Sequence, residues 1–333
     1  MNKLKKTLVR WESALVLLIL AEFLIFGSLN NKFLNPNRLF NSLNQFIPVC
    51  IIALFETFVM ITGGIDIQAG AITGLSSILV GVLWNDAGMN IFVACLFALI
   101  AGALCGLLSG FFVAYTGVQP MVVTLGGSFL YSGLALAVSN LSANEAYQGI
   151  SNFPDAFRAL AKTKLFGNIP MQFVIFFVLV LISFILLHRT KYGRRVFLSG
   201  VNQHAAEFSG IHTKRVIMST YMLCGLSASI AGILLTSYLG TAKSDLGNEY
   251  TLPIVTAVVL GGTSNLGGKG GVIGSALAGL VIGFLKIGLS MNGVQAQYLD
   301  IPVGILLVVT VSARFAGTNP KLQKLLTRFR RKA

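Results

Sequence analysis

The chain has 333 residues, of which 55% are apolar and only 11% are charged, and its mean hydropathy is +0.79. Soluble domains carry roughly 25% charged residues, so this composition excludes an ordinary soluble enzyme or binding module. A net charge of +14 would suggest nucleic-acid binding in a soluble protein. Here the basic residues gather at the two ends and in one loop, where they orient membrane helices and contact lipid head groups, so no nucleic-acid partner is expected.

Apolar runs of membrane-spanning length recur along the whole chain and predict an all-α, polytopic helix bundle without a separate soluble domain. The first run follows the basic residues 1–12; it is too long for a signal peptide and no A-x-A site follows, so an uncleaved helix is expected. The run at 251–262 is too short to span unbroken, so it should start in the preceding loop or be interrupted. About ten spans are predicted, at 13–29, 46–62, 67–84, 90–113, 121–140, 171–188, 216–238, 251–262, 272–290 and 298–313.

The distribution of positive charge orients these spans. With the N-terminus inside, the predicted cytoplasmic parts hold 18 of the 25 Lys and Arg residues, and an even number of helices puts both termini in the cytoplasm. The longest polar segment, 188–215, carries six basic residues against the single acid Glu207 and is therefore a cytoplasmic loop. The segment 141–170 becomes an external loop, in which Phe153, Phe157 and Leu160 recur at helical spacing and predict a short interfacial helix, either a lid or a docking surface.

Glycine pairs predict dense packing and broken helices. Units of the type G-x-x-x-G, such as Gly102 with Gly106 and Gly70 with Gly74, let helix backbones approach closely. Apolar stretches run into Gly-Gly at 61–64, 124–127 and 259–262, and the first and third continue into similar sequences. Breaks at matching places in two halves of a membrane protein indicate a transport pathway.

The motifs of the common enzyme classes are missing from the sequence. The stretch TSNLGGKGG at 263–271 lacks the first glycine and the Ser/Thr of a phosphate-binding loop, and no nucleophile elbow or zinc-protease motif occurs. The four cysteines lie in apolar runs, and the three histidines have no metal-ligand spacing. We therefore expect no enzyme activity, no metal and no cofactor.

Several acids lie in or beside the apolar segments, where a charge costs roughly 2.5–3.5 kcal/mol. Glu56 is midway along its segment, so it either lines a polar route or is satisfied by neighbouring groups. Asp66 follows the first Gly-Gly break and is expected to hold freed backbone amides by hydrogen bonds. Asp300 precedes Pro302 at the start of a segment and is expected to act as a cap.

Within the polar loop, Gly200 and Gly210 bracket a run that favours a short helix, with Asn202 as its N-cap. One interpretation is a basic loop that only fixes the topology. The other is a helix that docks onto a cytoplasmic partner, and it accounts for the bracketed run as well as for the charges.

Four segments resemble the permease subunits of bacterial ABC importers of the ribose/autoinducer-2 family. They cover nearly the whole chain in the family's order: TGGIDIQAGAITG (62–74), QPMVVTLGG (119–127), YGRRVFLSGVNQHAAEFSGI (192–211) and VVLGGTSNLGGKGGVIG (258–274). Within this family, residues 240–262 and 146–157 are most similar to the second permease of autoinducer-2 importers.

The resemblance implies one transmembrane permease domain over residues 1–333, in the bacterial inner membrane. It would move autoinducer-2 or a related sugar inward by alternating access. Implied partners are ATP-binding subunits, a second homologous permease, a periplasmic solute-binding protein and membrane lipid. The coupling helix to the ATPase would be 200–210, with Gly200, Asn202, Ala205, Ala206, Ser209 and Gly210 matching the family, and His204 and Glu207 at variable places.

The solute contacts are less defined. Asp66 is implied near the route, and the amide and aromatic candidates for the translocation pathway, beside Glu56, are Gln119, Phe129, Asn140 and Asn265. Two rival functions stay open: an ion-coupled secondary transporter with Glu56 as its proton or ion site, and a membrane scaffold that carries no solute.

Overall fold

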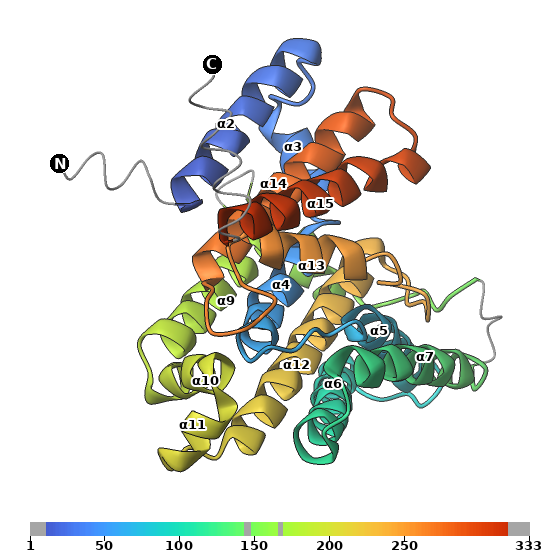
Figure 1. Ribbon diagram of the computed structural model, residues 1–333. Coiled ribbons are helices and arrows are strands. Elements are labelled where there is room, and N and C mark those ends of the chain that lie inside the picture. Colours follow the sequence, from blue (N-terminus) through green and yellow to red (C-terminus); the bar gives the residue numbers. More distant parts are fainter. Residues whose placement is uncertain (1–10, 143–147, 166–168, 319–333) are drawn as a thin grey trace, which may run out of the picture.

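The computed structural model describes residues 11–142, 148–165 and 169–318 and is built almost entirely of helices (Figure 1). The basic residues 1–10 and the basic tail 319–333, on which part of the predicted topology rests, lie outside this range. So do parts of the predicted external loop 141–170. The α-helices are α2 (Trp11–Leu29), α3 (Pro36–Leu43), α4 (Ile47–Ile61), α5 (Ala69–Asn85), α6 (Ile91–Phe111), α7 (Pro120–Ser139), α8 (Asp155–Lys162), α9 (Met171–His188), α10 (Lys191–Val201), α11 (Gln203–Phe208), α12 (Thr213–Leu239), α13 (Thr251–Leu260), α14 (Val272–Met291) and α15 (Asp300–Thr318).

Minor elements complete the fold. A π-helix, η1 (Phe112–Thr116), extends α6, and a 3-10 turn, η2 (Ala296–Tyr298), precedes α15. The strands β1 (Lys164–Leu165) and β2 (Ile169–Pro170) form a small antiparallel hairpin with Leu165 opposite Ile169.

Every predicted apolar segment is a helix. Six helices of the described chain are long and apolar enough to cross a membrane, and a seventh span results if α3 and α4, bent by 53°, are counted together. α5, α13 and the last helix are shorter apolar helices. The chain is thus a multi-pass membrane protein, while ten spans and cytoplasmic termini stay predictions. α13 does not extend into the preceding loop; it begins at Thr251 and ends at the Gly-Gly break, so of the two alternatives the interruption is correct.

The long helix α12 runs through the middle of the bundle and packs against α4, α5 and α6 (Figure 1). Gly102, Gly106 and Gly110 form the contact face of α6, because a Cβ at any of them would overlap α12. The predicted close approach of helices is confirmed there. Gly70 and Gly74 behave differently, since they receive the backbone of Gly247 and Ser244 in a loop rather than another helix.

The two ends of the bundle differ in what they carry. We call the end with α10 and α11 the inner end, and the end with α3, α8 and residues 240–250 the outer end. The predicted interfacial helix is α8; Phe157 is fully buried, and the Ser237 hydroxyl of α12 donates to its carbonyl oxygen over 2.6 Å. The apolar face of α8 therefore covers the bundle as a lid does, and a docking role for its outer face stays a prediction.

Candidate coupling and transport sites

The two predicted helix breaks contact each other. α4 ends at Ile61 and α13 at Leu260, and the amide of Gly268, in the loop after α13, donates to the Ile61 carbonyl oxygen over 2.8 Å. The remaining Gly-Gly pair, at 126–127, lies inside the continuous helix α7. Irregular backbone at membrane depth is tolerated where protein covers it, and here the loop after α13 satisfies the last carbonyl of α4.

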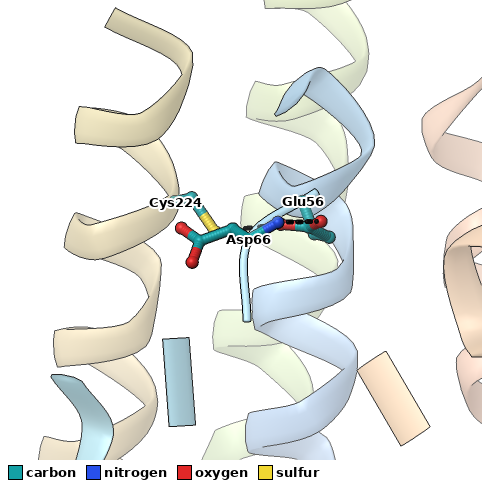
Figure 2. Close-up of side chains that lie close together, drawn as sticks. All are labelled: Glu56, Asp66 and Cys224. Carbon is teal, nitrogen blue, oxygen red and sulfur yellow. Dashed lines mark hydrogen bonds between the residues drawn. The ribbon is translucent and has the colours of Figure 1, made fainter. Parts of the chain in front are cut away.

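Glu56, Asp66 and Cys224 form a buried group at the first break, which we call the acid cluster (Figure 2). The Asp66 amide donates to Glu56 Oε1 over 2.9 Å, and the Cys224 thiol lies 3.5 Å from Glu56 Oε2. Asp66 Oδ1 in turn accepts the amide of Gln68 over 2.9 Å. Both carboxylates thus hold backbone amides of the break between α4 and α5, which is the arrangement expected of Asp66 from the sequence.

The acid cluster belongs to a wider polar network in the core. The Ser109 hydroxyl donates to Gln68 Oε1 over 2.7 Å and lies 3.2 Å from the Tyr131 hydroxyl, so α6 and α7 join the break through one amide side chain. The ligand atoms of Glu56, Asp66 and Cys224 lie within 4.8 Å of one another, close enough for a metal ion to bridge. No metal was expected from the sequence, because the cysteines lie in apolar runs without a paired cysteine. Glu56, Asp66 and Cys224 are also too far apart along the chain to form a recognisable ligand motif.

The predicted pathway residues do not gather at one place. Gln119 precedes α7 at the inner end and lines a cavity of about 500 Å³ together with Gly63 and Tyr221. Phe129 lies midway along α7 with 74% of its surface exposed. Asn140 caps the opposite end of α7, and Asn265 is exposed on the inner loop after α13. A pathway through all of them stays a prediction.

The polar loop 188–215 contains two helices instead of the single one expected. α10 begins after Thr190, whose hydroxyl oxygen accepts the Gly193 amide, and α11 begins after Asn202, whose side chain accepts the Ala205 amide over 3.0 Å. The predicted N-cap at Asn202 is thus present. The predicted boundary at Gly200 is wrong, because this residue belongs to the last turn of α10.

Gly200 has a packing role instead. A Cβ on it would overlap the carbonyl oxygen of Ile61 and lie 2.8 Å from the amide of Gly268. The end of α10 therefore rests on both helix breaks at once, which a residue with a side chain would prevent. Gly210, by contrast, follows α11 with φ of +80° and open space around it, so it serves as a C-terminal cap.

α11 exposes most of its side chains, as a docking helix requires. His204, Ala205, Glu207 and Phe208 are exposed, and Ala206 alone turns inward with 5% exposure. Phe208 is 93% exposed, which is unusual for a phenylalanine at a polar surface. Phe208 is not among the predicted coupling residues, although it is the single aromatic residue in the run VNQHAAEFS.

Glu207 ties α11 to the start of α12. Its carboxylate accepts a short hydrogen bond from the Thr213 hydroxyl, and Gln203 Nε2 approaches it at 3.4 Å. The Thr213 bond, aided by Gln203, holds the pKa of this exposed carboxyl below its ordinary value. The two helices are therefore joined at the inner end by a charge-assisted contact.

Comparison with known protein families shows which family this chain belongs to. Residues 38–311 match the family described as "Branched-chain amino acid transport system / permease component". The chain is a member of this permease family. As a permease it is a transport component and not an enzyme, and its apolar helices make it a multi-pass protein of the inner membrane.

Curated relatives match over most of their length. The protein named "Autoinducer 2 import system permease protein LsrD" of Klebsiella pneumoniae is 41% identical over 93% of this chain and 92% of its own. The proteins of that name from Salmonella typhimurium and Yersinia enterocolitica are each 43% identical over 91% of both chains. Among solved structures, PsaBC from Streptococcus pneumoniae in complex with Fab covers 93% of this chain and 99% of its own, with a TM-score of 0.46 and 14% identity.

Proposed function

We propose that this permease carries autoinducer-2 into the cytoplasm as one subunit of an ABC importer. The observation that supports this most strongly is the match along nearly the whole chain to permeases that are named for an autoinducer-2 import system. ATP would be hydrolysed by separate ATP-binding subunits, since the sequence has no phosphate-binding loop. A second homologous permease and a solute-binding protein complete the proposed assembly.

In this proposal α11 docks into a groove of the ATPase. The supporting features are its exposed face, its capped ends and the nearly fully exposed Phe208. An exposed aromatic side chain that fills a pocket of a partner is the usual centre of binding energy at an interface. Asn202, His204, Ala205, Glu207 and Ser209 would surround this anchor, and Gly210 would end the helix.

Movement would pass from α11 to the pathway through two contacts. The first is Gly200, where the end of α10 rests on both helix breaks. The second is the bond between Glu207 and Thr213, which connects α11 to α12 and so to the acid cluster through Cys224. A displacement of α11 by the ATPase would shift both breaks together, as alternating access requires.

The test is uptake of labelled autoinducer-2 into proteoliposomes that contain this chain, the second permease and the ATPase, with binding protein outside. We expect uptake that requires ATP and persists when the proton gradient is collapsed. Uptake that needs the gradient but not ATP would establish the ion-coupled alternative. Absence of uptake by the wild-type assembly under both conditions would support only the alternative of a membrane scaffold.

A substitution on α11 tests whether this helix docks onto the ATPase. Phe208→Ala should leave the fold intact, because the side chain is exposed, and should weaken ATPase binding about tenfold or more, as loss of a central aromatic anchor does. Leu24→Ala, at a position 75% exposed on the apolar helix α2, is the control and should bind the ATPase normally. Equal ATPase binding by wild type and Phe208→Ala would contradict docking through this side chain.

A further inference from the structure

A cavity of about 1090 Å³ opens at the outer end, away from the acid cluster and from all six predicted pathway residues. Its walls come from segments far apart in the sequence: the end of α3, the end of α12, residues 241–250, the start of α13 and the end of α14. Such convergence of several elements on one concave space is the usual form of a small-molecule site.

The wall formed by residues 241–250 is held in place from behind. Ala242 pairs with Ile150 in an isolated bridge, and the Lys243 amide donates to the Ser77 hydroxyl over 3.2 Å. Ser244 and Gly247 lie against the glycine face of α5, so close that no side chain fits between. The loop therefore presents Asp245, Asn248 and Glu249 to the cavity from a fixed backbone.

The polar groups of the lining suit a neutral solute rich in hydroxyl groups. The hydroxyls of Tyr238 and Tyr250 donate to the backbone carbonyls of Asn41 and Gln45, over 3.0 and 3.4 Å, and Tyr238 also interacts with the Gln45 side chain. A phenolic oxygen has more than one acceptor position, so each hydroxyl can still accept from a solute. The side-chain amides of Asn41 and Asn248 have no hydrogen-bond partner among the residues that the structure describes, and each can donate and accept.

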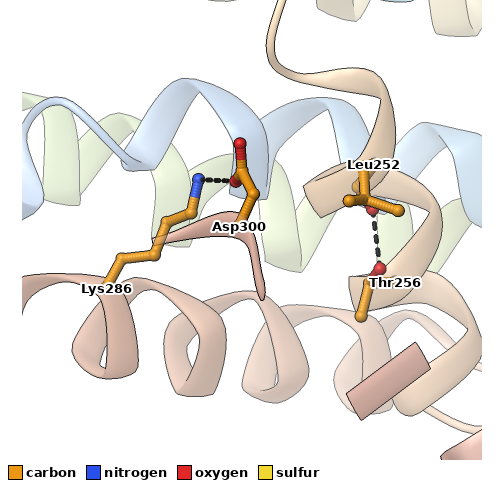
Figure 3. Close-up of polar contacts among 4 residues, drawn as sticks. All are labelled: Leu252, Thr256, Lys286 and Asp300. Atoms are coloured by element: carbon orange, nitrogen blue, oxygen red, sulfur yellow. Dashed lines mark hydrogen bonds and ion pairs between the residues drawn. The ribbon is translucent and has the colours of Figure 1, made fainter. Parts of the chain in front are cut away.

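The lining carries charges of both signs. Two lysines, Lys243 and Lys286, and two acids, Asp245 and Glu249, contribute to it. Lys286 is also held by Asp300 of α15, with 2.6 Å between Nζ and Oδ1, so its ammonium group is already neutralised (Figure 3). With Lys286 paired to Asp300, Lys243 remains against Asp245 and Glu249, so the lining carries one surplus negative charge, which disfavours an anionic solute and does not disfavour a neutral polyol.

We propose that this outer cavity is a binding site of the permease for a small neutral polyhydroxylated solute, contacted by Asn41 and Asn248 beside the two tyrosines. The proposal deepens the function proposed above and rests on it for the identity of the solute. The volume exceeds that of a single small sugar, so the solute binds with water around it. Gln148 and nine residues between 241 and 253 line the cavity and fall in the two segments that resemble autoinducer-2 permeases, which supports this lining as the place where selectivity for that solute is set.

The experiment is solute protection of an engineered cysteine in the assembled importer. Ser290 lines the cavity and is exposed, whereas Ser28 is exposed on α2 and lies outside the lining. The native cysteines are buried or half-buried, so a charged, membrane-impermeant methanethiosulfonate should react mainly with Ser290→Cys or Ser28→Cys. Autoinducer-2 at about ten times its dissociation constant should slow modification about tenfold at Ser290→Cys only, without binding protein or ATP.

Two asparagines on the same short helix provide the matched pair of variants. Asn41→Leu, alone or with Asn248→Leu, should abolish protection, because it removes amide contacts to the hydroxyl groups. Asn37→Leu, one turn earlier on α3 and outside the lining, should preserve it. Ribose, a neutral polyol, should protect at higher concentration, and the zwitterion leucine should not.

The outcomes separate this inference from the proposed function. ATP-dependent uptake with equal modification rates in the presence and absence of solute would overturn the cavity as a site and leave the function standing. Absence of uptake by the wild-type assembly, together with protection of Ser290→Cys by ribose, would overturn the proposed import function and leave the cavity standing as a binding site. Equal protection by leucine and ribose would overturn the assignment to neutral polyols.

Discussion

The outer and inner ends of the bundle are built in opposite ways. At the outer end, several segments stand apart around a cavity of about 1090 Å³, and polar side chains line the space. At the inner end, α10 and the two loops after α4 and α13 meet backbone to backbone, with Gly200 against Ile61 and Gly268. The central helix α12 runs through both regions.

This difference shows where the fold tolerates change. Side chains around a cavity can be exchanged at the cost of a contact or two, because solvent replaces what is removed. Backbone contacts between fixed loops cannot adapt, since a Cβ there must displace a main chain. Substitutions should therefore destabilise the protein most where backbones meet at the inner end, and least on the exposed surface of that end.

Gly200→Ala should have the largest effect. Its Cβ would overlap the Ile61 carbonyl, so the end of α10 must move off both breaks at a cost of about 3 kcal/mol, the upper range for overpacking. Thermal unfolding of the detergent-purified protein measures this. Gly210→Asn is the control and should change stability little, because asparagine tolerates a positive φ and the site is open. Equal stability of Gly200→Ala and wild type would contradict the contact.

Glu56 should come next, because it is fully buried in the acid cluster and joins the first helix break to α12 through Asp66 and Cys224. Glu56→Leu leaves the buried Asp66 amide without its acceptor, which costs about 1–3 kcal/mol. Glu56→Gln keeps an oxygen at the same place, so it should fold normally and retain ATP-dependent uptake. Unfolding measurements and uptake by both variants provide the test. A well-folded Glu56→Gln protein without any uptake would contradict a structural role and revive the ion-coupled alternative.

The sequence predicted those parts of the fold that depend on local patterns. All ten apolar segments are helices, because their length and apolar character are visible residue by residue. The Asn202 cap and the chain breaks after Ile61 and Leu260 were also predicted, since asparagine and paired glycines have local conformational preferences.

The rest depends on contacts between distant residues. Nothing near Gly200 indicates that it faces Ile61, and nothing near Cys224 indicates that it joins Glu56 and Asp66. α10 was missed because a polar amphipathic helix resembles a basic loop when its partner surface is unknown. The outer cavity was missed for the same reason, since its walls come from several segments that are far apart in the sequence.

A smaller effect is expected at the outer end from Lys286→Met. The ion pair with Asp300 is partly exposed, 18% for the lysine and 44% for the aspartate, and pairs of this kind contribute about 0–1 kcal/mol. Asp300 remains favourable after the change because it lies in the first turn of α15. A double-mutant cycle with Asp300→Asn, followed by unfolding in detergent, measures the coupling. A coupling as large as the Gly200→Ala effect would contradict the contrast between the two ends.

The smallest effect should be a pH-dependent loosening of α11. The Thr213 hydroxyl bond holds the pKa of Glu207 below its ordinary value, so this contact contributes stability at neutral pH and loses it in acid, as the pH falls through the lowered pKa and the carboxylate is protonated. Thr213→Val removes the bond and keeps the shape of the side chain. Hydrogen exchange of α11 amides should then be faster in the variant at neutral pH, and the difference from wild type should shrink in acid. Faster exchange in the variant by the same factor at every pH would show that Thr213 acts by packing alone, and that the charge of Glu207 does not join α11 to α12.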